Sequence, residues 1–421
     1  GETAAFERVV DRYRRPLMAL AAARLGSVAE AEDVAQEAFV QAFLRLHQLR
    51  RPEAAHAREY LAGRGLADEV IRQFRLGYAP DSGFLLRDRF KTQYDEELLR
   101  ASGLFSWKEA GEARGSSTRP QGGLAQDDAS EKSSQPTTHD SRPTTLYSKF
   151  RNRVMFPISN ESGKIIAFTG RTLATEDKSG PKYLNSPETA IYSKGRVLYN
   201  LDRAREAVRK LDYVILVEGQ MDCISVFMAG LHNAIASSGT AFTEAQVRLL
   251  SRYTKKIIVN FDPDTAGAAA AERSLAMLVA EDFSIKVATL EQGFDPDLYV
   301  RKKGREAYGK VLQGAPKYFD YLIARALAQF PPRSPEAKVK AVNFLLPHIQ
   351  RVPSRIARDE LANDIAQKLG IDSAVLRQEL RHAGATRSSS VKSAAEAQIT
   401  QAERILIRAL ASATAMSEES P

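Results

Sequence analysis

Short apolar runs alternate with amphipathic helical patterns along residues 211–300. Runs typical of buried strands occupy 213–217, 233–236, 255–260 and 284–290. Between them, helical spacing of apolar residues predicts helices over 221–229, 243–250 and 266–279, the second opened by a Thr243/Gln246 capping pair. This alternation predicts an α/β fold with a mostly parallel sheet covered by helices, in which ligands bind at the carboxyl ends of the strands.

The rest of the chain divides into segments with other patterns. Residues 1–50 have the spacing of a helical hairpin, 58–107 that of short helices around a Gly63–Gly65 turn, and 147–200 that of alternating strands. Amphipathic helices after 301 predict a bundle that ends near 384, followed by a Ser-rich linker over 385–398 and one helix within 399–421. Between 115 and 145, 20 of 31 residues are Ser, Thr, Pro, Gly or Gln, which predicts a disordered insertion in a surface loop.

The composition excludes several kinds of metal and disulfide site and several classes of protein. One cysteine and six histidines cannot build a disulfide framework, an iron–sulfur cluster or a Cys-rich zinc site, so we expect no zinc and any metal to be held by oxygen. No apolar run approaches the roughly 18 residues that span a membrane, and no signal peptide is evident, so we expect a cytoplasmic protein. The chain starts with Gly1, so we expect a fragment of a longer protein.

Acidic residues follow three of the predicted strands. Glu218 follows the first strand, Asp262 and Asp264 follow the third in "NFDPDTAG", and Asp295 and Asp297 follow the fourth in "GFDPDLYV". The carboxyl ends of parallel strands meet at one edge of a sheet, so these carboxylates can converge. Each pair alone is also compatible with an ordinary turn or helix cap.

Converging carboxylates repel one another unless a hard cation neutralises them. Mg²⁺ prefers carboxylates, waters and phosphate oxygens. Two or more such ions, Mg²⁺ or Mn²⁺, could bridge an attacking hydroxyl and a nucleoside triphosphate, which is the chemistry of nucleotidyl transfer. The sequence therefore predicts a metal-dependent catalytic site built on Glu218, Asp262 and Asp264, with Asp295 and Asp297 as further ligands.

Basic and aromatic residues interleave before this region. Lysines and arginines contact backbone phosphates, and aromatic rings stack on unpaired bases. The formal net charge of +8 favours polyanions in the same way without deciding the partner. The candidates for nucleotide or DNA contact are Arg151, Arg153, Arg171, Lys182, Tyr183, Asn185 and Lys194. An ordinary sheet face also mixes such residues, so this pattern alone leaves the function open.

The N-terminal segment resembles a known family in its amino-acid sequence. "FERVVDRYRRPLMALAAARLGSVAEAEDVAQEAFVQAFLRL" is similar to the first half of region two of extracytoplasmic-function sigma factors. In that family this helix docks on the clamp of RNA polymerase, so the resemblance implies RNA polymerase as a partner for residues 1–50. The aromatic and basic helix that reads promoter DNA in the family has no counterpart here.

Residues 58–380 resemble the bacterial DNA primase catalytic core. The resemblance rests on "FRNRVMFPI", "PKYLNSPET", "SKGRVLYNLDRA", "VEGQMDCISV", "FDPDTAGAAAA" and "DPDLYVRKKG", and the E-G…D-x-D arrangement is similar to the TOPRIM fold. It implies a basic subdomain over 58–210, a TOPRIM subdomain over 211–300 and a closing helical bundle over 301–384. It assigns metal binding to the five strand-end carboxylates, with Gly219 and Asp222 in support, and template or nucleotide contact to the basic set.

The resemblance implies a DNA-directed RNA polymerase that makes short primers on single-stranded DNA from ribonucleoside triphosphates. The family's N-terminal zinc-binding domain is absent here, and 399–421 resembles only the start of its helicase-binding region, so we expect helicase binding only if that domain is present. Two alternatives stay open. One is a non-catalytic single-stranded-DNA adaptor that docks on RNA polymerase, and the other is a TOPRIM nuclease or topoisomerase.

Overall fold

The computed structural model describes residues 49, 52–92, 94, 96–109, 144–174, 180–238, 242–260 and 268–381. The predicted hairpin over 1–50 lies outside these residues apart from Leu49, as do the linker over 385–398, the segment 399–421 and most of the insertion predicted over 115–145. The insertion was predicted slightly too long, because Thr144 and Thr145 already belong to a strand.

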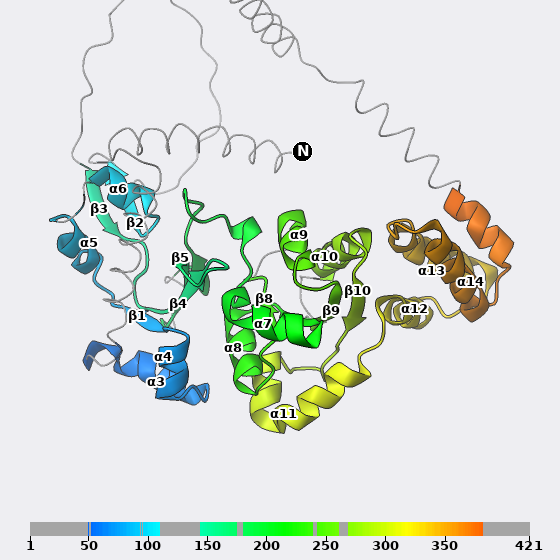
Figure 1. Ribbon diagram of the computed structural model, residues 1–421, viewed down its shortest axis with the longest axis horizontal. Helices are drawn as coiled ribbons and strands as arrows, with labels where there is room; N and C mark the ends of the chain where they lie inside the picture. Colours follow the sequence, from blue (N-terminus) through cyan, green and yellow to red (C-terminus); the bar gives the residue numbers. More distant parts are fainter. Residues whose placement is uncertain are drawn as a thin grey trace, which may run out of the picture.

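The N-terminal part contains short helices and two antiparallel sheets (Figure 1). Its elements are η1 (Pro52–Ala54), α3 (Ala55–Gly63), α4 (Asp68–Gln73), β1 (Gly77–Ala79), α5 (Leu85–Phe90), α6 (Glu96–Ala101), β2 (Phe105–Glu109), β3 (Thr144–Ser148), β4 (Arg153–Ser159), β5 (Ile165–Thr172), β6 (Tyr183–Asn185) and η3 (Lys194–Arg196). One sheet has the order β1-β4-β5-β6, and β2 pairs with β3 in the other.

A parallel sheet forms the centre of the structure. Its elements are α7 (Leu201–Leu211), β7 (Val214–Val217), α8 (Gln220–Met228), β8 (Ala234–Ala236), α9 (Glu244–Ser251), β9 (Lys256–Val259), α10 (Ala268–Ala280), β10 (Ser284–Val287) and α11 (Pro296–Gly314). The strand order is β10-β9-β7-β8 and every pairing is parallel, which confirms the predicted fold class.

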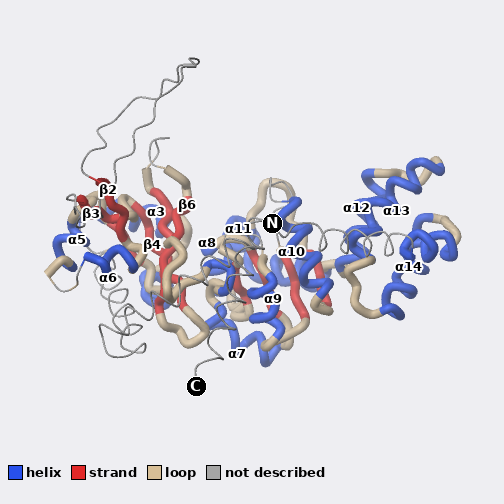
Figure 2. Tube along the Cα trace, turned by 90° about the horizontal axis from the view of Figure 1, so that it is seen from above, coloured by secondary structure: helices blue, strands red, loops and turns tan. Residues whose placement is uncertain are grey.

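The alternation of β7 side chains explains why helices cover both faces of this sheet. Ile215 and Val217 join one buried cluster with α8 and α11, whereas Val214 and Leu216 join a second cluster with α7, α9 and α10. The first cluster continues into the N-terminal part through residues of α3, α4 and β4. The β1-β4-β5-β6 sheet, called the basic sheet below, and the parallel sheet therefore share one core, and Figure 2 shows them side by side.

Further helices follow α11 and lie at the far end of the structure in Figure 1. They include α12 (Tyr318–Gln329), α13 (Pro335–Ile349) and α14 (Arg355–Leu369), and a further helical stretch covers 373–381. Ser334 and Ser354 cap α13 and α14 by accepting backbone N–H bonds, and Gly370 ends α14 in a left-handed conformation. These helices match the predicted bundle.

Candidate active site

Glu218 directly follows β7, an interior strand that lies between β9 and β8 in the sheet. The chain turns at Gly219, the N-cap of α8, and the helix begins at the next residue. A Cβ on Gly219 would lie 2.8 Å from Oδ2 of Asp222, so only glycine lets this carboxylate fold back against the turn. The sequence "VEGQMD" therefore directs two acidic side chains to one end of β7.

Asp222 connects α8 to the start of α11. Its Oδ1 accepts a hydrogen bond from the backbone N–H of Asp297 at 3.2 Å. Burial, followed by the negative charges of Asp295 and Asp297, raises the pKa of Asp222 to about 7. Asp222 therefore lies beside two further carboxylates, and no ion pair to it is found in the part of the chain that the structure describes.

Asp295 and Asp297 occupy different environments although they are two residues apart. Asp295 caps α11 by accepting the N–H of Leu298 at 2.6 Å, and its side chain is exposed. Asp297 is fully buried and receives the guanidinium groups of Arg64 and Arg301.

The carboxylate of Asp297 is already satisfied by protein donors. Ser225 donates to it at 2.6 Å, in addition to the two arginines. Burial acts to raise its pKa, but the bonds from Arg301, Ser225 and Arg64 outweigh burial, so the pKa lies below the ordinary value. Both carboxylate oxygens of Asp297 are thus engaged by protein donors, and its assignment as a metal ligand stays a prediction.

Asp262 and Asp264 lie in 261–267, outside the described residues. The strand before them, β9, neighbours β7, and the N–H of Asn260 donates to Leu216 O at 2.9 Å. The side chain of Asn260 is held by Ala288 O at 3.1 Å and Tyr308 Oη at 2.8 Å. Within the described part of the chain, no three His, Cys, Asp or Glu side chains come close enough to hold a metal ion.

The basic sheet presents Arg171 and Tyr183 beside these carboxylates. The two residues are partners in the β5–β6 register, and the guanidinium of Arg171 lies 4.0 Å from the ring centroid of Tyr60. Partial burial, with the charge of Asp222 among the further causes, raises the pKa of Tyr183 to about 12. Arg64 lies 5.6 Å from the centroid of the same Tyr60 ring and pairs with Asp297, so these contacts join the two candidate sets of residues.

A chain of hydrogen bonds joins Asn185 to the acidic helix. Gln220 Nε2 donates to Thr169 Oγ1 at 3.0 Å, and Thr169 donates in turn to Asn185 Oδ1 at 2.6 Å. Gln220 is the residue after Gly219, so the side chain that follows the E-G turn fixes β5 and β6 against α8.

The other basic candidates differ in how far their side chains are exposed to solvent. Lys182 and Arg151 are exposed, and Lys194 is half-buried, with a pKa lowered by that burial. Arg153 is buried and donates to the carbonyls of Gly170 and Pro181 at 2.9 and 3.0 Å. The guanidinium of Arg153 therefore holds two backbone carbonyls, and its contact with DNA or nucleotide stays a prediction.

Four residues of the site escaped the sequence analysis. They are Tyr60, Arg64, Ser225 and Arg301. Arg301 follows Asp297 by four residues on one helix, a spacing that favours an ion pair and that could have been noticed. Arg64 is 233 residues from Asp297 in the sequence, so no local pattern reveals that contact.

Family comparisons agree with this geometry. Residues 44–116 and 123–205 match the DNA primase catalytic core, N-terminal domain, and 215–300 match the Toprim-like family. Residues 9–65 match Sigma-70 region 2, and 319–374 match the DnaB-helicase binding domain of primase. The last match falls on α12–α14, which we predicted as the closing bundle of the core, rather than on 399–421.

Whole-chain comparisons decide the family. A DNA primase of Clostridium acetobutylicum is 36% identical over 316 residues, which cover 75% of this chain and 46% of that protein. A solved DNA primase domain from Pseudomonas aeruginosa is 30% identical with a TM-score of 0.68, and the match covers 83% of this chain and 100% of that one. A solved DnaG catalytic core is 31% identical with a TM-score of 0.64, and the match covers 99% of it. The chain belongs to the DnaG primase family.

As a member of the DnaG family, the chain corresponds to the catalytic core. It spans about half the length of the curated relatives it matches. None of the helices among the described residues is long and apolar enough to cross a membrane.

Proposed function

We propose that this chain is a DNA-directed RNA polymerase that synthesises short RNA primers on single-stranded DNA during replication in the cytoplasm. The observation that carries the proposal is the ion pair of Arg64 with Asp297 beside the contact of Arg171 with Tyr60, because it joins the acidic end of a parallel sheet to a basic and aromatic sheet in a chain of the DnaG family. Carboxylates bind the divalent ions that hold phosphate groups, and basic side chains bind the phosphates of nucleic acid.

The candidate metal ligands are all carboxylates, which suit divalent ions that prefer oxygen. Glu218, Asp262, Asp264 and Asp295 would hold Mg²⁺ or Mn²⁺, and burial together with the charge of Asp295 raises the pKa of Asp222 beside them. When bound, such ions supply Lewis-acid stabilisation of the phosphate oxygens during transfer. We assign Asp297 a positioning role instead, because it orients Asp222 through its backbone N–H and ties α11 to Arg64.

The residues of the basic sheet orient the nucleotides. Arg171 and Lys182 supply positive charge for phosphate groups, Lys194 and Arg151 extend that charge, and Tyr183 presents a ring on which a base can stack. The primer 3′-oxygen forms a bond to the α-phosphorus of the incoming ribonucleotide while the bond to the β-phosphate oxygen breaks and pyrophosphate leaves. The proton of the attacking hydroxyl passes to solvent.

Single-stranded DNA is the proposed template. A solved DnaG primase catalytic domain, 31% identical with a TM-score of 0.65, is described as bound to single-stranded DNA. Exposed Arg151 and Lys182 on this chain supply cations without a carboxylate partner among the described contacts, which supports the same kind of ligand here.

The test is extension of an annealed RNA primer on a DNA template, with ribonucleotides and Mg²⁺ or Mn²⁺. Supplying the primer removes the need for a zinc-binding domain at initiation. We expect incorporation by the wild type, loss of more than a hundredfold in Glu218→Gln and in Asp262→Asn with Asp264→Asn, and no change in the surface control Asp320→Asn. DNA binding without incorporation would favour the adaptor, and phosphodiester cleavage without incorporation would favour the nuclease.

Helicase contact is a separate part of the proposal. The match of 319–374 to the helicase-binding domain of primase supports α12–α14 as the contact surface. Val339, Ile356 and Val375 are 57%, 74% and 57% exposed on or beside these helices. We expect Ile356→Glu to abolish co-elution with a hexameric replicative helicase while primer extension is unchanged, and co-elution like that of the wild type would remove this surface from the proposal.

The sigma-like segment supports a further partner. Residues 9–65 match Sigma-70 region 2, so we infer that RNA polymerase is a candidate ligand for the N-terminal segment. Pull-down of core RNA polymerase by residues 1–421, but not by a chain that lacks residues 1–48, is the expected result. Equal capture by both chains would contradict it.

A further inference from the structure

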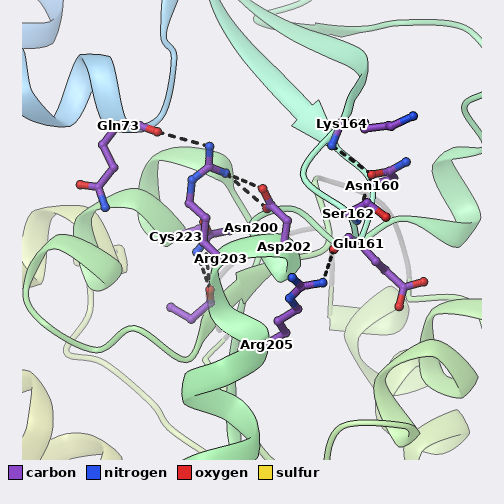
Figure 3. Close-up of polar contacts among 11 residues, drawn as sticks. Gln73, Asn160, Glu161, Ser162, Lys164, Asn200, Asp202, Arg203, Arg205 and Cys223 are labelled. Atoms are coloured by element: carbon purple, nitrogen blue, oxygen red, sulfur yellow. Dashed lines mark hydrogen bonds and ion pairs between the residues drawn. The ribbon is translucent and has the colours of Figure 1, made fainter. Parts of the chain in front are cut away.

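The β4–β5 turn is a rigid hairpin tip. Asn160 Oδ1 accepts the backbone N–H groups of Ser162 and Lys164 at 3.0 and 3.1 Å, and Gly163 adopts φ +81° (Figure 3). Side-chain bonds of this kind fix an Asx-type turn, and the left-handed glycine closes it. The tip therefore has a defined shape with which to meet another element.

This tip rests on two helices of the parallel-sheet subdomain. Arg205 of α7 donates from Nη1 to the carbonyl of Glu161 at 2.7 Å. Arg252 and Tyr253, which follow α9, both donate to Oε2 of Glu161 at 2.5 Å. Glu161 thus joins the basic sheet to α7 through its backbone and to the end of α9 through its carboxylate. Figure 3 shows the Arg205 contact.

The first turn of α7 also holds α4. Arg203 donates from Nη2 to Gln73 O at 3.3 Å (Figure 3). Its guanidinium also lies 5.2 Å from the ring centroid of Phe74. Asp202 fixes this guanidinium with an ion pair at 3.1 Å and lies against the hairpin, since a Cβ on Gly163 would be 3.8 Å from its Oδ2. One turn of helix therefore contacts both the hairpin and the N-terminal helices.

The hairpin tip and the active site are at opposite ends of β5. Arg171 is six residues beyond Ile165, a separation of about 20 Å along an extended strand. At the site end of β5, Thr169 is joined to Gln220 of α8 by a side-chain bond, and Arg171 lies against the ring of Tyr60. Because β5 runs from the tip to Arg171 and pairs there with β6, a rotation at the tip would displace Arg171 and its partner Tyr183 relative to the carboxylates.

We propose that Glu161, with Arg205, Arg252 and Tyr253, is a remote positioning device that sets the angle of β5 and thereby the placement of Arg171 and Tyr183 over the metal site. Glu161 is a positioning residue in this assignment, since it touches neither substrate nor metal ligands. The inference rests on the proposed primer synthesis for its kinetic consequence, but its geometric consequence can be measured without activity.

The geometric test uses two spin labels, at Lys91→Cys on the N-terminal part and Glu306→Cys on α11, both exposed positions. The native Cys223 is buried and leaves the labels specific. Pulsed electron resonance should give a narrow distance distribution in the labelled wild type and a broader or shifted one in Glu161→Ala and Arg205→Ala. An unchanged distribution in both variants would overturn the proposal, whether or not the chain is active.

The kinetic test compares Glu161→Ala with Asp212→Asn, which removes an exposed ion pair to Lys256 within one subdomain. We expect Glu161→Ala to raise KM for the ribonucleotide roughly tenfold, with a smaller loss in kcat and an unchanged Tm. Glu161→Gln, which keeps an acceptor oxygen, should recover part of the loss, and Asp212→Asn should match the wild type. Wild-type kinetics in Glu161→Ala would refute the inference, whereas an inactive wild type would refute only the proposed function.

Discussion

Asp297 shows how burial decides the role of a carboxylate. The sequence places it in a D-x-D pair with Asp295, but the fold buries it between Arg64 and Arg301 and leaves Asp295 exposed. Removing one member of such a group leaves the opposite charges without a partner. The same buried position lets Asp297 hold the α11 backbone against Asp222.

We expect Asp297→Asn to lower the free energy of unfolding by about 3 kcal/mol, the low end for a broken buried pair because both arginines are partly exposed. Asp320→Asn, which breaks an exposed pair with Lys368, should cost less than about 1 kcal/mol. Denaturant unfolding measures both. Equal losses in the two variants would contradict the role of Asp297.

The stability difference between wild type and Asp297→Asn should depend on pH. The folded pKa of Asp297 lies below its ordinary value of 3.8, so its charge stabilises the fold fully above that value and progressively less as the pH falls through the folded pKa. The difference should be constant from pH 7 to about pH 5 and shrink below about pH 4. A difference that grows on acidification would contradict this sign.

Gly219 tests the placement of Asp222. Because a Cβ at Gly219 would lie 2.8 Å from Asp222 Oδ2, Gly219→Ala must displace that carboxylate. We expect primer extension to fall at least about tenfold, since a displacement of this size at a catalytic site is costly. Circular dichroism and Tm should stay close to those of the wild type, and full activity would show that the position of Asp222 is unimportant.

At the scale of elements, helix α9 shows what local sequence predicts well. Thr243 accepts the N–H of Gln246 at 3.2 Å, and Gln246 Oε1 accepts the N–H of Thr243 at 3.0 Å, so the predicted capping pair is present. Thr243 also donates to Gly195 O, and Gln246 Nε2 donates to Val197 O at 2.8 Å. The cap therefore also anchors the segment that carries Lys194.

Thr243→Ala should destabilise the chain by about 1.5 kcal/mol, because it removes a helix cap and the bond to Gly195. The matched variant Ser354→Ala removes a cap on α14 with no such additional contact and should cost nearer 1 kcal/mol. Chemical denaturation compares the two. A loss of stability in Thr243→Ala that is smaller than the loss in Ser354→Ala would mean that the bond from Thr243 to Gly195 of η3 does not stabilise the fold.

The limits of sequence reading follow from the range of each interaction. Strand and helix patterns predicted the parallel sheet and the acidic ends of its strands, because periodicity and capping act over a few residues. The roles of Arg153 and Asp297 were predicted from their polarity and from sequence resemblance, neither of which reveals that a side chain is buried. The contacts of Arg64 with Asp297 and of Arg252 with Glu161 join distant segments, so only the fold supplies them.

At the scale of the whole molecule, the basic sheet and the parallel sheet share a continuous core. Leu61 and Phe74 belong to the same buried cluster as Val217 and Ile224. Two parts joined by such a core should unfold together rather than separately. The positions of the basic residues relative to the carboxylates are then a property of the folded core as well as of the hairpin contacts.

Two probes can test this cooperativity in one sample. The single tryptophan, Trp107, reports on the N-terminal part, while far-ultraviolet dichroism is dominated by helices elsewhere. Their denaturant midpoints should coincide, and Leu61→Ala should shift both equally, by about 3 kcal/mol of stability. A tryptophan transition at lower denaturant than the dichroism transition would contradict the shared core.

The central claim is that carboxylates from separate strands share bound divalent ions, and calorimetric titration of the metal-free chain with Mn²⁺ tests it most directly. We predict saturable binding by the wild type that weakens at least about tenfold in Glu218→Gln and in Asp262→Asn, while Asp297→Asn and Asp320→Asn retain a similar binding enthalpy. Binding by the Glu218 and Asp262 variants that is indistinguishable from that of the wild type would contradict the account.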